Sequence, residues 1–442
     1  MSNGVHFGNL LYRNELFYFY NKDYRDKVPF LDCKKAGSSM KYSRQEVIEY
    51  VREEEIKFIQ LVFCDVFGRQ KNISITPNEL PRAFEYGIAV DASAIAGFGD
   101  EARSDLLLHP DTETLMLLPW RPEHGKIVRM FTHISYPDGR EFENDTRWLL
   151  KRAVEYAEQA GLSFYFGAEQ EFYLFKLDES GEPTRIPYDK AGYMDTAPDD
   201  KGENIRREIC LTLEQMGIYP ESSHHEEGPG QNEIDFRYSD PITAADNAMT
   251  FQTIVKTIAR RNGLCADFSP KPLADKAGSG FHVNMSVKAD GSCDDLYHMI
   301  AGILEHIKSM TLFFNPCEDS YERFGKEKAP GYISWSSENR SQLVRVPAAV
   351  GEYRRAELRS PDPTANPYLA FALLIYAAVY GIENKLLPQK ETNINLYKVS
   401  EEILSKFEAL PQNLKEAQKF AAESEFIKKH MPYSILEAYC SR

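Results

Sequence analysis

Four short segments of the chain carry acidic, histidine or arginine side chains at alternate positions. They are Gly167–Phe175, Gly230–Tyr238, Gly278–Val287 and Arg354–Pro363. Alternation of polar and apolar residues is the period of a β-strand, in which side chains two positions apart point to the same face. We therefore expect four strands, each with one apolar face in a core and one polar face that could carry chemistry.

The polar faces of these strands would gather many charged groups. Their residues are Glu169, Glu171, Glu233, Asp235, Arg237, His282, Asn284, Ser286, Arg355, Glu357 and Arg359. Carboxylates repel one another, and burying them without a partner is costly. A divalent cation removes this cost, and carboxylates with a single imidazole suit Mg²⁺ or Mn²⁺. Because arginines bind phosphate with paired hydrogen bonds, the set predicts phosphoryl transfer from a nucleotide.

Length and composition limit the classes of protein to which this chain can belong. A chain of 442 residues favours two domains. With 43% hydrophobic and 27% charged residues, it has the composition of a soluble globular protein. A formal net charge of −15 argues against nucleic acid or an anionic membrane as a partner. An anionic substrate would then need a local basic cluster, which residues 340–359 supply.

The cysteines and the apolar segments indicate a cytoplasmic protein. The seven cysteines are scattered, odd in number and without CxxC spacing, which is typical of reduced thiols. No signal peptide is visible near the start of the sequence. The most apolar helix candidate, Tyr368–Gly381, is shorter than the roughly 20 residues that span a bilayer, so we expect a buried core helix.

We expect three parts along the chain. Residues 1–40 form an aromatic-rich extension, residues 41–140 a small α+β domain, and residues 141–442 a larger domain. Asp178–Gly202 is expected to be a polar loop. Helices are predicted at Lys41–Glu54 with Ser43 as N-cap, from Asn144 or Asp145 to about Ala160, and at Asn204–Gly217, Pro241–Asn262, Asp294–Asn315 and Asn366–Lys385.

The motifs resemble those of the glutamine synthetase family, type I, in its shorter bacterial form. The likeness runs from about Lys41 to the C-terminus. It rests on GAEQEF, HHEEGPGQNEI, PKPLADKAGSGFHVNMS and ELRSPDPTANPYL, together with WSSENRSQLVRVP and HPDTETLMLLPW. Several long motifs in the family's order make the resemblance specific.

The resemblance implies a fold and an assembly. The fold would be α+β, with a small N-terminal β-grasp-like domain and a large catalytic domain on a curved antiparallel sheet with flanking helices. The family assembles as a dodecamer of two stacked hexameric rings, with active sites between subunits. Asp91 would then be donated to the site of a neighbouring subunit.

Carried over to matching positions, the family's functional residues fall mainly on the four segments. One metal site falls on Glu171, Glu226 and Glu233, and the other on Glu169, His282 and Glu357. The residues implied for ATP and the transferred phosphoryl group are Ser286, Arg340, Arg345 and Arg355. Those implied for the amino-acid substrate are Gly278, Arg323 and Arg359. The implied ions are Mg²⁺ or Mn²⁺, two or three per active site, with ATP as a substrate.

The amine half of the implied site departs from the family pattern. The family's covering loop reads SYKRLVPGYEAP, and its glutamate takes a proton from ammonium. Here the loop is SYERFGKEKAP, one residue shorter, which puts Lys328 at that position and Glu327 one residue early. A cation at this position would repel ammonium. Glu327 could still serve if the loop follows a different path.

Two further positions near the implied amine site lose polar groups. The family's FDGSSI loop is VDASAI here, which keeps Asp91 but puts Ala94 in place of a serine. Ala277 stands where the family has an asparagine beside the bound amino acid. These changes favour an amine with an apolar substituent. Tyr397, in NLYKV, resembles a tyrosine that some members adenylylate, but the chain lacks the insertion of that subtype, so we expect Tyr397 to be structural.

The sequence therefore predicts an ATP-dependent carboxylate–amine ligase. It would form a γ-glutamyl phosphate from glutamate and ATP and transfer the acyl group to an amine, with a substituted amine slightly favoured over ammonia. One alternative is glutamine synthetase proper, using ammonia. Another is a non-catalytic relative that senses a nucleotide or an amino acid, for which residues 1–40 could form a contact surface.

Overall fold

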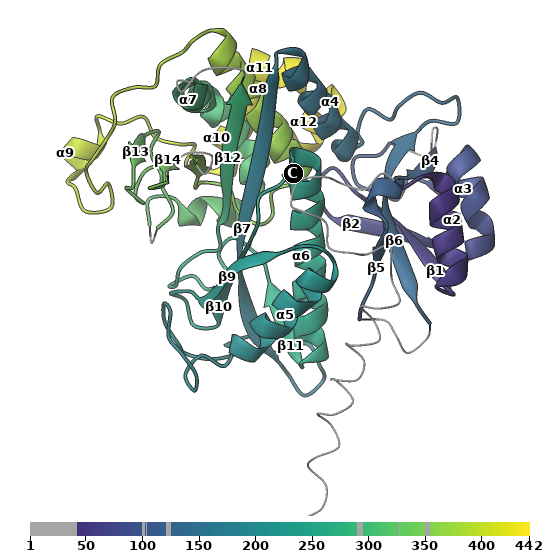
Figure 1. The fold of residues 1–442 in the computed structure, drawn as a ribbon. Coiled ribbons are helices and arrows are strands. Elements are labelled where there is room, and N and C mark those ends of the chain that lie inside the picture. Colours follow the sequence, from purple (N-terminus) through teal and green to yellow (C-terminus); the bar gives the residue numbers. More distant parts are fainter. Residues whose placement is uncertain are drawn as a thin grey trace, which may run out of the picture. The chain divides into compact units, whose positions relative to one another are not determined.

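The computed structural model describes residues 42–99, 102, 104–120, 125–289, 295–326, 328–349 and 354–442. The predicted extension at residues 1–40 and the loop residue Glu327 lie outside this range. Two β-sheets and their helices make up the described structure (Figure 1). Among the described residues, no helix combines the length and the apolar character that a membrane crossing requires.

The first sheet lies in the N-terminal part of the chain. Its strand order is β2–β1–β6–β4–β3, with β5 paired to β6, and β1 runs parallel to β6. The helix α2 begins after Ser43, the predicted N-cap, which also forms a capping box with Glu46. The elements are α2 (Arg44–Glu53), β1 (Phe58–Cys64), β2 (Gln70–Ile75), η1 (Pro77–Glu79), α3 (Leu80–Tyr86), β3 (Ile88–Asp91), β4 (Asp105–Pro110), η3 (Thr112–Thr114), β5 (Met116–Leu117) and β6 (Ile127–Ser135).

The second sheet has nine strands and contains all four predicted segments. Its order is β13–β14–β15–β12–β7–β10–β9, with β8 and β11 also paired to β7. The pairs are antiparallel except β13–β14. The strands are β7 (Leu162–Leu177), β8 (Pro183–Pro187), β9 (Pro220–His225), β10 (Gln231–Phe236), β11 (Leu264–Asp267), β12 (Phe281–Ala289), β13 (Trp335–Ser337), β14 (Val344–Val346) and β15 (Ala356–Leu358).

Strand register brings the predicted polar faces together. Glu171 pairs with Glu233 across β7 and β10, while Glu169 pairs with His282 across β7 and β12. Asn284 of β12 pairs in turn with Glu357 of β15. The intervening residues are buried in the core, among them Phe172, Leu174, Ile234, Val283 and Leu358. The alternation in the sequence therefore predicted the two faces of these strands correctly.

Helices cover the second sheet. The apolar helix α8 is almost completely buried and packs against α4 and α7, as predicted for a core helix. Asp145 caps α4, and Asn366 caps α8. The helices are α4 (Thr146–Gln159), α5 (Glu203–Gln215), α6 (Pro241–Arg261), α7 (Asp295–Phe314), η4 (Glu318–Arg323), α8 (Pro367–Glu383), α9 (Glu401–Leu404), α10 (Leu414–Glu423), α11 (Glu425–His430) and α12 (Tyr433–Cys440).

Several strands were not predicted from the sequence, among them β8 and β9 of the second sheet. β8 lies inside the segment Asp178–Gly202, which was expected to be a loop, and β9 lies between the predicted helix Asn204–Gly217 and the predicted strand at Gly230–Tyr238. β8 is bounded by prolines and pairs with β7 at only a few positions. β9 is polar and mostly exposed, so it has no period-two apolar signal. Both strands form through pairing with neighbours that are distant in sequence, which local pattern does not encode.

A buried ion network joins the two parts of the fold. Arg147 of α4 binds Asp246 of α6 with Nε and Nη2, both at 3.0 Å, and its Nη1 lies 2.9 Å from Asp111 beside η3. The hydroxyl of Tyr368 donates a 2.7 Å hydrogen bond to Asp246. Burial alone would lower the pKa of Arg147, but Asp246 and Asp111 raise it well above its usual value.

Arg147→Leu should lower the free energy of unfolding by about 3 kcal/mol, because it leaves Asp246 buried without its cation. Chemical denaturation would measure this loss. Arg140→Leu is the matched control, since it breaks a fully exposed pair with Asp138 and should change stability little. Equal effects of the two substitutions would contradict a structural role for the buried network.

Candidate active site

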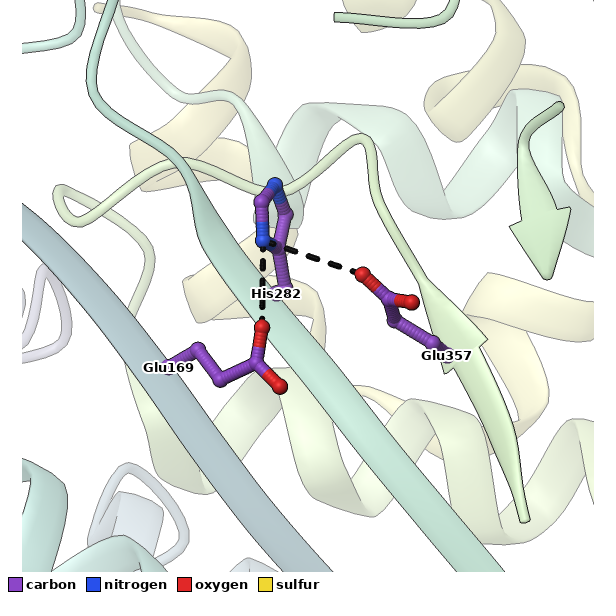
Figure 2. A group of neighbouring side chains, drawn as sticks. All are labelled: Glu169, His282 and Glu357. Atoms are coloured by element: carbon purple, nitrogen blue, oxygen red, sulfur yellow. Dashed lines mark hydrogen bonds and ion pairs between the residues drawn. The ribbon is translucent and has the colours of Figure 1, made fainter. Parts of the chain in front are cut away.

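The first group of possible metal ligands lies at the centre of the second sheet. Glu169 of β7, His282 of β12 and Glu357 of β15 point toward one another (Figure 2). His282 Nδ1 is 3.3 Å from Glu169 Oε2 and 3.8 Å from Glu357 Oε1. One ligand atom from each residue lies within 4.8 Å of the others, a spacing that a single cation could bridge.

A second group consists only of glutamates. Glu171, Glu226 and Glu233 are all buried, and one oxygen from each lies within 4.8 Å of the others. Burial, followed by the charge of nearby carboxylates, raises the pKa of Glu171 and raises that of Glu233 well above its usual value. Glu171 and Glu233 therefore lack sufficient positive charge around them, whereas His224 and Lys328 outweigh burial at Glu226 and lower its pKa. The donor set, oxygen atoms with one imidazole nearby, fits a hard divalent cation.

Arginines hold Glu357 in its charged form. Arg345 Nη1 and Arg359 Nη1 each lie 2.5 Å from a different oxygen of Glu357. Burial would raise the pKa of Glu357, but Arg359, His282 and Arg345 outweigh it and lower the pKa to about 2. Glu357 therefore stays ionised, and its pKa is shifted in the opposite direction from those of Glu171 and Glu233.

The arginines implied for ATP differ in how closely they approach the first metal-ligand group. Arg355 Nε donates a 2.8 Å hydrogen bond to Asn284, whose amide donates at 2.7 Å to Glu169. Arg355 is thereby connected to the first metal-ligand group. Arg340 is exposed in the segment between β13 and β14.

A hollow of about 120 Å³ lies beside the first group. Its walls include Ser286, Arg355 and Asn284, which the sequence had singled out, and the aromatic residues Tyr165 and Tyr238, which it had not. The two tyrosine rings meet edge to face at 6.0 Å between centroids. Only their places at the ends of predicted strands, close to acidic residues, could have indicated them from sequence.

The structure also brings together the residues implied for the amino-acid substrate. A Cβ on Gly278 would lie 2.6 Å from Arg323 Cγ and 2.7 Å from a backbone oxygen, so only glycine fits against this arginine. Arg323 is buried and donates to the carbonyls of Ser360 and Pro361 at 3.0 and 3.3 Å. Arg359 donates at 3.3 Å to the carbonyl of Lys328, which ties the covering loop to the sheet.

Lys328 lies beside the second group of glutamates. Its ammonium is 3.0 Å from Glu227, 3.6 Å from Glu226, and 4.4 Å from the centre of the Tyr193 ring. Burial would lower the pKa of Lys328, but Glu226 and Glu227 raise it, so the cation is stabilised. Its backbone is left-handed, with φ of 72°. Sequence reasoning missed Tyr193 and Glu227, because neither occupies a position marked by the alternating strands.

Asp91 does not join these groups within the described chain. It is exposed at the end of β3, in the first sheet, and its carboxylate accepts hydrogen bonds from the backbone and hydroxyl of Ser93 at 2.9 and 2.7 Å. Ala94 is exposed nearby, and Ala277 accepts a 2.6 Å hydrogen bond from the hydroxyl of Tyr173. Donation of Asp91 to a neighbouring subunit stays a prediction.

Comparison with known proteins identifies the family. Residues 143–442 match the family model for the glutamine synthetase catalytic domain, and residues 55–137 match that for its β-grasp domain. A glutamine synthetase of Clostridium saccharobutylicum is 45% identical over 88% of this chain and 91% of its own. One of Methanosarcina mazei is 42% identical over 90% and 92%. The chain belongs to the glutamine synthetase family.

Solved structures of the family agree with the fold described above. A chain titled "GmaS/ADP complex" has a TM-score of 0.82 and 27% identity, covering 91% of this chain and 94% of its own. The glutamine synthetase of Plasmodium falciparum has a TM-score of 0.80 at 21% identity, covering 92% and 96%, and shows the fold alone. The predicted architecture of an N-terminal β-grasp domain and a larger catalytic domain is confirmed. The protein is an ATP-dependent ligase of the glutamine synthetase type, a family that uses ATP and divalent metals.

Metal binding should depend on pH through the buried glutamates. A carboxyl whose pKa is raised in the folded state adds stability below its unfolded pKa and loses it as pH rises through the folded value. Without metal, Glu233 should therefore weaken the fold more at pH 8 than at pH 5, which is just above the ordinary glutamate pKa. At a Mg²⁺ concentration a hundred times the Kd at pH 8, the free energy of unfolding should rise by about 2.7 kcal/mol at pH 8 and by less at pH 5, where Mg²⁺ must displace protons.

Thermal unfolding with and without Mg²⁺ at the two pH values would measure this effect. Glu233→Gln should remove most of the Mg²⁺-dependent rise in Tm. Glu182→Gln, which removes an exposed glutamate charge in the same domain, should leave that rise unchanged. An equal rise in both variants would show that the buried glutamates do not hold the ion.

Proposed function

We propose that this protein activates the γ-carboxylate of glutamate with ATP and joins it to an amine, taking a substituted amine in preference to ammonia. The observation that carries the preference is the ammonium of Lys328 beside Glu226, Glu227 and Tyr193. The proposal that ATP activates glutamate rests on the family. The proposal that a substituted amine is preferred rests on the loop that carries Lys328.

The two groups of possible ligands support the activation step. Each group would hold Mg²⁺ or Mn²⁺, which offsets negative charge on phosphoryl oxygens during transfer from ATP. The ligand residues would be Glu171, Glu226 and Glu233 in one group and Glu169, His282 and Glu357 in the other. A relative at 27% identity was solved with ADP, which supports nucleotide binding in the hollow beside Ser286 and Arg355.

Arginines would orient the two substrates. Arg340, Arg345 and Arg355 would face the phosphoryl groups, because a guanidinium pairs well with phosphate oxygens. Arg323, packed against Gly278, and Arg359, paired with Glu357, would hold the carboxylates of glutamate. The acyl phosphate formed from ATP and glutamate has a good leaving group, so a neutral amine can attack its carbonyl carbon and release phosphate.

The surroundings of Lys328 argue against ammonium as the acceptor of the acyl group. A small cation would be drawn to a pocket of carboxylates and an aromatic face, but Lys328 already places a cation there. A second positive charge close to Lys328 would be repelled. Ala94 and Ala277 each lack a polar group that could bind ammonium. An amine whose apolar substituent fills space near these alanines is the acceptor that fits best.

Assembly completes the proposed site. Asp91 is exposed on the first sheet and has no interaction with the metal-ligand groups within the described residues. Donation of Asp91 by an adjacent subunit, in a ring-based dodecamer, would bring it to the amine site.

Ammonia remains the second candidate acceptor, because the relatives at 42–45% identity are named glutamine synthetase. In that case Lys328 would have to move away from Glu226 and Glu227 during the reaction. A non-catalytic sensor has no comparable support, since both groups of possible metal ligands are complete.

The first test is ADP release with ATP, Mg²⁺ and glutamate, measured against ammonium and a panel of primary amines from methylamine to polyamines and aromatic amines. We expect release with a substituted amine at concentrations where ammonium gives little. Efficient release with ammonium alone would establish the second candidate. The γ-glutamyl product would be identified by mass spectrometry.

Lys328→Glu tests the origin of the preference. Replacing the cation with a carboxylate should raise kcat/KM for ammonium by at least about tenfold. A change of about 1.4 kcal/mol in the interaction energy with the ammonium ion already corresponds to that factor. Lys326→Glu makes the same charge change at an exposed position of the same loop and should leave this value within about twofold. Both exchanges keep a non-glycine residue, so backbone strain at Lys328 is not altered. An unchanged kcat/KM for ammonium in Lys328→Glu would show that this lysine does not cause the preference.

A further inference from the structure

The segment before α9 is hydrogen-bonded along the edge of the second sheet. Trp335 Nε1 donates a 2.6 Å hydrogen bond to the carbonyl of Gln389, and the amide of Thr392 donates at 3.0 Å to the carbonyl of Trp335. Further along, the amide of Leu396 donates at 3.0 Å to Ser341 Oγ. These bonds fix the backbone immediately before Tyr397.

The hydroxyl of Tyr397 is buried, yet it has no hydrogen-bond partner among the described residues. A buried hydroxyl normally finds one, because the unmade bond is costly. The fold therefore does not use the polar atom of this side chain. The sequence had suggested a purely structural role, which the aromatic ring alone could fill.

The two arginines implied for substrate carboxylates share this feature. Arg323 Nε and Arg359 Nε are also buried without a partner in the described structure. The remaining nitrogens of Arg323 bind the carbonyls of Ser360 and Pro361, and those of Arg359 bind Glu357 and the carbonyl of Lys328. Each arginine therefore has one N–H donor, at Nε, without an acceptor among the described residues.

Tyr397 lies within electrostatic range of both arginines. Burial raises the pKa of Tyr397 to about 12, although the charges of Arg359 and Arg323 act in the opposite direction. The phenol is thus protonated at neutral pH and can donate a hydrogen bond. Two guanidinium Nε donors and one phenol donor, none with an acceptor among the described residues, suit an anionic group with several lone pairs.

We propose that the hydroxyl of Tyr397 donates a hydrogen bond to the glutamate carboxylate held by Arg323 and Arg359. Tyr397 then contributes directly to binding of the acid substrate. The inference rests on the proposed function only in taking glutamate as that substrate, and it is independent of which amine accepts the acyl group.

Tyr397→Phe tests the proposal, because it removes the hydroxyl and keeps the ring. Binding of glutamate to the full-length protein would be measured by calorimetry with Mg²⁺ and a non-hydrolysable ATP analogue, without any amine. We expect the Kd for glutamate to rise at least about tenfold, as for loss of a hydrogen bond to a charged group. The Kd for the analogue and the Tm should not change, since the hydroxyl has no hydrogen-bond partner among the described residues.

Tyr321→Phe is the matched control. The hydroxyl of Tyr321 is likewise buried without a partner in the described chain, but the charged group that acts on it is Asp362. This variant should keep the Kd for glutamate within about twofold of the parent.

An unchanged Kd in Tyr397→Phe overturns the proposal, as does an equal loss in Tyr321→Phe. A drop in Tm that accompanies weaker binding of both ligands also overturns it, because it indicates a structural role. A parent protein that binds no glutamate overturns this inference together with the acid half of the proposed function. Amine selectivity is untouched by all of these outcomes.

Discussion

Repulsion among buried carboxylates is the constraint on which the site depends. Five glutamates and one histidine from neighbouring strands form the two groups of possible metal ligands. Glu357 is kept ionised by Arg345 and Arg359, whereas burial and the charge of neighbouring carboxylates raise the pKa values of Glu171 and Glu233. The sheet is therefore stable in this form only if protons or divalent ions compensate the charge.

The strand-borne half of the site could be predicted from the sequence. A period of two fixes which side chains share a face, and the apolar partners Phe172, Leu174 and Val283 are indeed buried. Caps at Ser43 and Asp145 likewise located the starts of α2 and α4. The family resemblance supplied the antiparallel sheet and the grouping of ligands from strands that are distant in sequence, which local pattern alone does not provide.

The loop-borne half could not be predicted to the same degree. Lys328 was placed by counting along a shortened loop, but its contacts with Tyr193 and Glu227 follow from how separate loops approach each other. The unpartnered hydroxyl of Tyr397 is a property of packing, and the residue type gives no sign of it. The polar strands β8 and β9 were missed for the same reason, since tertiary pairing overrides weak local preference.

The register of β7 and β12 has a consequence for how such enzymes can diverge. Inserting or deleting one residue within either strand would exchange its core face with its charged face, so changes of length there destroy fold and chemistry together. The loop that carries Lys328 lies outside this strand pairing, so a change in its length does not exchange a core face with a charged face. The architecture thus separates a half-reaction that resists alteration from one that is free to acquire new acceptors.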